Sequence, residues 1–205
     1  MSDPEVAKNP IQEKLAKDRA EINEAILSTT LGWSALESNA ATLLDTIINT
    51  RGLMGYAIYF APNNAETRFE ILNQAFYSFI DGTTVEDTVE PEWKLLKKQL
   101  DRSRANRNKV IHGAIGHVGT KNKTYVRLTP VMFDINRLTR QINRNQIVGM
   151  SAHDVTSVAN GIWKVNKSVM LFNEIAVAIH NDDKKALQEK LLELSDHRQK
   201  KFDHR

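Results

Sequence analysis

The chain has 205 residues, of which 41% are hydrophobic and 26% are charged, and its formal net charge is +3. This composition is typical of a folded protein and argues against a disordered chain. The absence of cysteine excludes a disulfide framework, a thiol nucleophile and any cysteine-ligated metal site. We find neither a signal-peptide pattern nor an uninterrupted apolar run of about 18 residues, and so expect a cytoplasmic protein without membrane contact.

The first predicted element is a helix of roughly 40 residues beginning at Pro10, where a missing backbone N–H is tolerated. Apolar residues recur along it at helical spacing. They include Ile11, Leu15, Ile22, Ile26, Trp33, Leu36, Leu43 and Ile47. The poor helix formers Ser28, Thr29 and Thr30, followed by Gly32, predict a kink or a short break. The pattern leaves open whether this is one helix or two.

Two further helices are predicted in the first half of the chain. One covers about 65–80, with Asn63 or Asn64 as its N-cap. Another begins at Pro91 and carries an apolar stripe toward Gly113, which we expect to serve as its C-cap.

Residues 114–148 have a different pattern. Two short β-like runs flank a turn-forming segment at 120–123, which predicts a hairpin. Weak alternation over 131–148 predicts strand and loop. We therefore treat 114–148 as a β/loop insertion.

Helical periodicity returns after the insertion. It predicts a helix from Ser151 to His180, with Asp154 completing a capping box, and a short helix over 186–194 before a frayed tail at 195–205. In sum, we predict an all-α helical bundle forming a single domain over 1–205, with a small β-hairpin excursion between the last two long helices.

Charge is distributed unevenly along the chain. Residues 91–148 contain 13 lysines and arginines against three acidic residues, a charge of +10, whereas the remainder of the chain carries −7. A basic segment in an acidic frame is typical of a surface that binds a polyanion. The alternative is that the basic residues lie on a solvated helix face.

One polar cluster interrupts the apolar stripe of the helix that begins near Pro91. Asn108 and His112 are four residues apart and share a helix face, which Arg104 extends by one turn. Arg107 falls on the apolar stripe itself, where a guanidinium needs a partner or must reach solvent. Arginine and histidine near a helix end can bind a phosphate and move a proton. Equally, His112 could be a capping residue and Arg107 a member of an ordinary ion pair.

The segment Arg107-Asn108-Lys109-Val110-Ile111-His112 resembles the Arg-x4-6-His motif of the HEPN superfamily, in its Arg-Asn-x-x-x-His form. The resemblance implies a HEPN-like helical bundle that forms a homodimer, with two motifs meeting in one composite site. It also implies a metal-independent endoribonuclease without a cofactor, of the kind found in toxin–antitoxin and anti-phage systems. Ala114 stands where the nucleotidylated-toxin subclass has tyrosine, which disfavours that subclass.

The same resemblance implies roles for the motif residues. His112 would act as general base or acid, Arg107 would stabilise the charge of the transition state, and Asn108 would orient His112 or the phosphate. We expect Glu37 to support the site by pairing with Arg107 or polarising His112. Arg104 is a second supporting residue.

We expect RNA to be the partner of the basic insertion, with an antitoxin or a regulatory protein as a further possible partner. The scarcity of aromatic residues there favours contacts to phosphates over base reading. The basic residues that we predict to bind RNA are Lys121, Lys123, Arg127, Arg137, Arg140 and Arg144. Two alternatives stay open: a non-catalytic HEPN-like dimer that binds RNA or nucleotides or acts as a scaffold, and a purely structural helical oligomer.

Overall fold

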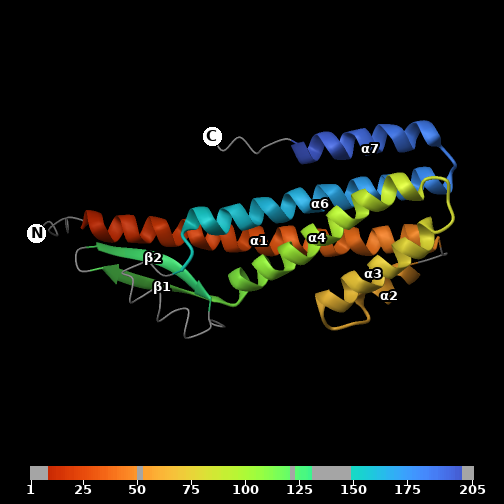
Figure 1. The fold of residues 1–205 in the computed structure, drawn as a ribbon. Coiled ribbons are helices and arrows are strands. Elements are labelled where there is room, and N and C mark those ends of the chain that lie inside the picture. The colour runs from red at the N-terminus through yellow and green to blue at the C-terminus, as the bar shows by residue number, and fades with distance from the viewer. Residues whose placement is uncertain (1–8, 50–52, 121–122, 131–148, 200–205) are drawn as a thin grey trace, which may run out of the picture. The chain divides into compact units, whose positions relative to one another are not determined.

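A computed structural model describes residues 9–49, 53–120, 123–130 and 149–199. These residues form an all-α fold with a single antiparallel hairpin between α4 and α6, as the sequence predicts (Figure 1). The elements are α1 (Pro10–Ile48), α2 (Met54–Phe60), α3 (Ala65–Ile80), α4 (Glu86–Ile111), β1 (Gly113–Thr120), β2 (Lys123–Pro130), α6 (Ala152–His180) and α7 (Lys184–Gln199).

The chain divides into two compact units. Unit 1 comprises Met1–Leu31 and Asn106–Asn160, and unit 2 comprises Gly32–Ala105 and Gly161–Arg205. Helices α1, α4 and α6 contribute residues to both units. The expectation of a single domain over 1–205 therefore stays a prediction, and the two units are described separately.

Unit 1 has a small aliphatic core between the hairpin and helical segments. Figure 1 shows the hairpin beside the N-terminal part of α1. The register pairs Ile115 with Leu128 and His117 with Val126, so these residues share one face of the hairpin. That face packs on the helices through a core of Ile22, Ala25, Val110, Val126, Leu128 and Val155.

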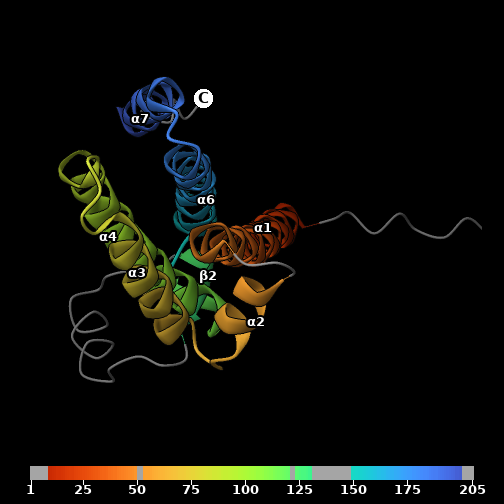
Figure 2. The same cartoon turned by 90° about the vertical axis from the view of Figure 1, so that its right-hand side faces the viewer.

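Unit 2 has a larger, aromatic core. The rings of Phe76 on α3 and Trp93 on α4 stack with centroids 3.9 Å apart, and Phe172 on α6 meets both edge-on. Trp93 Nε1 also donates to Asn73 Oδ1 at 3.0 Å, which satisfies its polar atom. Figure 2 shows α3 and the first part of α4 side by side, which is the arrangement these contacts require.

Helix α1 is continuous, so the short break predicted near residues 28–32 is absent, while the alternative of a kink stays a prediction. The hydroxyls of Thr29 and Thr30 donate to the carbonyls of Ala25 and Ile26, four residues earlier. These bonds satisfy the hydroxyls within the helix, and α1 stays continuous although bonds of this kind tend to bend helices.

The predicted helix over 65–80 is confirmed, with Asn64 as its cap: Asn64 Oδ1 accepts from Thr67 N at 2.8 Å.

Helix α4 does not begin at Pro91, as predicted, but at Glu86, and it contains Pro91 within it. A proline one turn inside a helix removes only one backbone bond, and the earlier turn is already closed by Val89 N donating to Val85 O.

Gly113 is not a C-cap but the first residue of β1, paired with Pro130. A side-chain Cβ at this position would lie 2.7 Å from the Leu128 side chain, so any residue larger than glycine would require Leu128 to move.

The Ser151–Asp154 capping box is confirmed, since Asp154 Oδ2 accepts from Ser151 N at 2.8 Å and from Ser151 Oγ at 2.7 Å.

The last helix, α7, is longer than predicted. Residues 195–199 belong to α7 instead of a frayed tail, because His197 Nε2 contacts Lys164 O at 2.9 Å and Arg198 pairs with Glu92. The predicted strand and loop at 131–148 and the tail beyond 199 lie outside the described residues.

Candidate functional site

The motif predicted from sequence lies at the C-terminal end of α4, in unit 1. Asn108 and His112 are exposed, and the backbone N of His112 donates to Asn108 O at 3.2 Å. This bond closes the final turn of α4, and Gly113 then starts β1. The transition from helix to strand therefore holds the His112 backbone between two regular elements while its side chain faces solvent.

Arg107 is half-buried beside this exposed pair. Its Nη1 donates to Asn108 Oδ1 at 3.1 Å, so the guanidinium and the amide are in direct contact. The next stripe position, Val110, is buried in the unit 1 core. Burial of the arginine stem with its polar end on Asn108 is the expected behaviour of an arginine on an apolar stripe.

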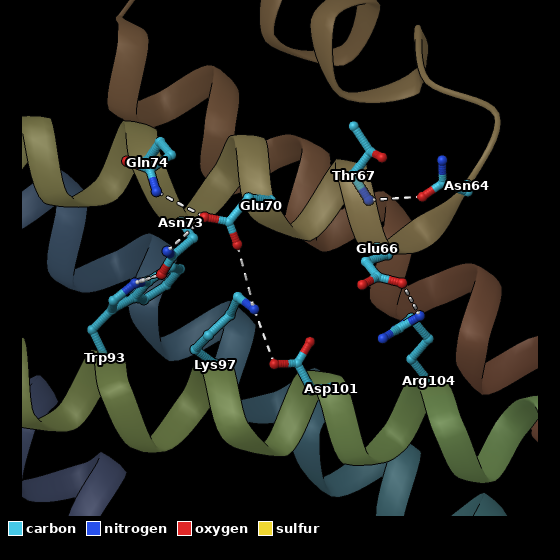
Figure 3. Close-up of polar contacts among 10 residues, drawn as sticks. All are labelled: Asn64, Glu66, Thr67, Glu70, Asn73, Gln74, Trp93, Lys97, Asp101 and Arg104. Carbon is cyan, nitrogen blue, oxygen red and sulfur yellow. Dashed lines mark hydrogen bonds and ion pairs between the residues drawn. The ribbon is translucent and has the colours of Figure 1, made fainter.

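The two predicted supporting residues lie in unit 2 and have partners there. Arg104 Nη1 bonds to Glu66 Oε2 at 2.7 Å, as Figure 3 shows. Glu37 Oε1 accepts from Arg68 Nη1, also at 2.7 Å, an ion pair that the sequence did not predict, and the expected pairing of Glu37 with Arg107 stays a prediction. Nothing in the sequence around Arg68 signalled that it would take this carboxylate.

The Glu37–Arg68 pair belongs to a half-buried polar cluster in unit 2. The Arg68 side chain also donates from Nε to Pro62 O at 2.9 Å and lies 5.1 Å from the centroid of the Phe60 ring. The Tyr59 hydroxyl is buried, and burial, reinforced by the charge of Glu37, raises its pKa. A hydroxyl kept protonated in this way is a structural group in unit 2.

Some basic residues of α4 form ion pairs with acidic residues of α3. Figure 3 shows Lys97 Nζ between Asp101 at 2.9 Å and Glu70 at 3.7 Å. Hydrogen bonds from Gln74 and then Asn73 to Glu70 lower the pKa of its carboxyl, with a smaller effect from Lys97. The Lys97 and Arg104 charges of the +10 segment are therefore engaged in ion pairs inside unit 2.

Of the six predicted RNA-binding residues, Lys123 and Arg127 lie on β2, and Lys121, Arg137, Arg140 and Arg144 lie outside the described residues. Arg127 Nη1 donates to Val126 O at 3.0 Å, and its guanidinium carbon lies 5.1 Å from the Tyr125 ring centroid. Hydrogen bonds from Ser151 lower the pKa of Asp154, with smaller contributions from His153 and Arg127.

Unit 1 also contains a groove of about 450 Å³ that the sequence did not reveal. It runs between α1 and the start of α6, and its polar lining comes from Glu21, Glu24, Ser28, His153 and Thr156. The lining residues come from two helices that are far apart in the sequence, so no sequence pattern predicts that they lie together.

Within the described ranges, no group of three histidine, aspartate or glutamate side chains is placed to hold a metal ion. In the same ranges, no helix combines the length and apolarity that a membrane crossing requires. Comparison of the chain with protein-family models, with curated proteins and with solved structures gives no match.

Proposed function

We propose that the protein is a metal-independent endoribonuclease of HEPN type, with Arg107, Asn108 and His112 as its catalytic residues. The observation that carries the proposal is the end of α4, where Asn108 and His112 are exposed one turn apart and Arg107 bonds to the Asn108 amide. A guanidinium, an amide and an imidazole are thereby gathered on one short stretch of backbone. This set can bind a phosphate and transfer a proton.

The chemistry is a transesterification. His112 removes the proton of a ribose 2′-hydroxyl, whose oxygen attacks the adjacent phosphorus while the bond to the 5′ oxygen breaks. A second acid returns a proton to that 5′ oxygen, so the products end in a 2′,3′-cyclic phosphate and a 5′-hydroxyl. Arg107 stabilises the additional negative charge on the phosphorane-like transition state, and Asn108 holds Arg107 and orients the phosphate.

A homodimer would supply the second acid. His112 serves as the base in one protomer, and the same residue of its partner protonates the leaving oxygen. A C2 arrangement brings identical patches together, so a single exposed motif is sufficient to build such a composite site. Lys123 and Arg127 on β2 would add phosphate contacts within unit 1.

The proposal is tested by incubating the purified protein with RNA in EDTA. Cleavage should persist in the chelator, and His112→Ala should lower its rate by at least about 100-fold, as is typical of a lost general acid or base. His117→Ala is the matched control, because His117 is also exposed and lies in the hairpin of the same unit. Equal losses in the two variants would contradict the assignment.

The dimeric site has its own test. If both His112 side chains are needed, mixing equal amounts of wild-type and His112→Ala protein, with subunit exchange, should leave about one quarter of the wild-type activity, against about one half for independent subunits. RNA binding without cleavage by the wild type would instead favour the non-catalytic alternative, in which the same surface binds RNA or nucleotides.

A further inference from the structure

The hairpin has two faces with different surroundings. Residues 115, 117, 126 and 128 share the face that packs on the unit 1 core. The alternation of side chains along a strand therefore assigns the pairs immediately before and after each of these to the opposite, outer face. Those pairs are Ala114 with Thr129, Gly116 with Arg127, and Val118 with Tyr125.

The outer face carries the planar side chains of Tyr125 and Arg127, and Gly116, which has no side chain, lies across from Arg127. Tyr125 and Arg127 are half-buried neighbours on β2, with the guanidinium carbon 5.1 Å from the ring centroid and anchored by its bond to Val126 O. On β1, opposite Arg127, a Cβ on Gly116 would meet no atom within 4 Å. Among the described residues, the space directly above Gly116 is therefore open, while Gly149 borders Arg127 on the other side of β2.

The hairpin follows the motif at the end of α4 directly along the chain. Figure 1 shows β1 following directly from that helix, and Gly113 is joined to His112. Because a strand rises about 3.3 Å per residue, Gly116 lies roughly 13 Å and Val118 roughly 20 Å along the chain from His112. A polynucleotide strand bound at His112 can reach both cross-strand pairs within a few nucleotides.

We propose that Tyr125 and Arg127 form a stacking subsite for an unpaired base of single-stranded RNA whose scissile phosphate lies at His112. The inference rests on the proposed function and specifies its substrate class. Aromatic rings and guanidinium planes stack on bases of any sequence, so the subsite adds affinity without reading sequence. Bases in a duplex are already stacked on their neighbours and cannot offer a free face.

Binding measured in a His112→Ala background separates this inference from the cleavage chemistry. The probe is a fluorescein-labelled oligoadenylate, used alone and annealed to oligouridylate, and the readout is fluorescence anisotropy. Tyr125→Leu should weaken binding of the single strand about tenfold while changing duplex binding by less than about twofold. Tyr125→Phe, which keeps the ring, should bind like the parent.

Arg127→Lys keeps the charge but loses the planar group, so it should weaken single-strand binding about threefold without changing the salt dependence. Tyr77→Leu, on α3 in unit 2, is the matched tyrosine control, and thermal unfolding confirms that each variant is folded. The inference is overturned if Tyr125→Leu binds the single strand normally, if single-strand and duplex binding fall equally, or if the parent binds no single strand. Absence of cleavage with a Tyr125-dependent affinity would overturn the proposed catalysis alone.

Discussion

Units 1 and 2 are stabilised by different kinds of contact. The core of unit 1 is built from small aliphatic side chains such as Ala25 and Val126, whereas unit 2 contains the largest fully buried side chains, Trp93, Phe76 and Phe172 among them. Unit 2 is also joined by ion pairs between helices, including Glu37–Arg68. Exposed motif residues belong to unit 1.

The comparison of the two units separates the residues proposed for catalysis from those that stabilise the fold. Aromatic packing and half-buried ion pairs hold side chains in one geometry, which suits a scaffold. An exposed histidine and amide at the end of a helix can meet a substrate. We therefore assign chemistry to the end of α4 and stability mainly to unit 2, and each prediction below tests that division.

The largest effect is expected at Arg107. Arg107→Ala removes the guanidinium that would stabilise the transition state and should lower the cleavage rate about 100- to 1,000-fold. Arg102→Ala, on the exposed side of the same helix, is the matched control and should cleave at close to the wild-type rate. A single-turnover assay measures both. A normal rate for Arg107→Ala would place the chemistry elsewhere.

The next largest effect concerns the unit 2 core. Trp93→Ala removes the ring that stacks on Phe76 and leaves a cavity, so it should lower the free energy of unfolding by about 3–5 kcal/mol. Denaturant titration followed by circular dichroism measures the loss. Cleavage per folded molecule should stay close to wild type, and a rate that fell more steeply than the folded fraction would break the division between the units.

Glu37→Gln tests a residue that the sequence assigned to the site and the structure places with Arg68. The side chains of Glu37 and Arg68 are only 15% and 18% exposed, so leaving the arginine charge without its carboxylate should cost about 2 kcal/mol of unfolding free energy. Arg104→Ala, which breaks a pair with the exposed Glu66, should cost less than about 1 kcal/mol. A loss of cleavage without a loss of stability in Glu37→Gln would restore its predicted supporting role.

The smallest effect is a dependence of stability on pH at the start of α6. Hydrogen bonds from Ser151 lower the pKa of Asp154 in the folded protein, so ionised Asp154 stabilises the fold above the ordinary carboxyl pKa, and this contribution is lost as the pH falls through the lowered value. Asp154→Ala should therefore cost about 1 kcal/mol at neutral pH and progressively less in acid. Thermal unfolding of both proteins across pH would show the difference shrink, and a constant difference would contradict the capping role.

Local patterns in the sequence predicted most of the fold. Asn64, the Ser151–Asp154 box and the pairing of the two hairpin strands each depend on residues close in the sequence, and all three predictions are confirmed. The errors involve wider context. Helix α1 stays continuous across 28–32, where Thr29, Gly32 and Trp33 are buried in the fold, and the last turn of α7 carries contacts of Arg198 with a residue more than a hundred positions earlier.

The candidate site was predictable only where it is local. Arg107, Asn108 and His112 lie within six consecutive residues at the end of α4 and are joined by two hydrogen bonds, so their spacing specifies their proximity. The partners of Glu37 and Arg104 come from α3, and sequence spacing carries no information about which helix will lie opposite. Summed charge misleads for the same reason, since Lys97 and Arg104 are paired with acidic side chains.

The most direct test of the assignment is the chemical nature of the ends produced from a defined RNA in EDTA. Transesterification by His112 predicts a 2′,3′-cyclic phosphate on one fragment, a 5′-hydroxyl on the other, and no cleavage where a 2′-deoxyribose precedes the scissile phosphate. Fragments with 3′-hydroxyl and 5′-phosphate ends, or cleavage that ignores the missing 2′-hydroxyl, would contradict it.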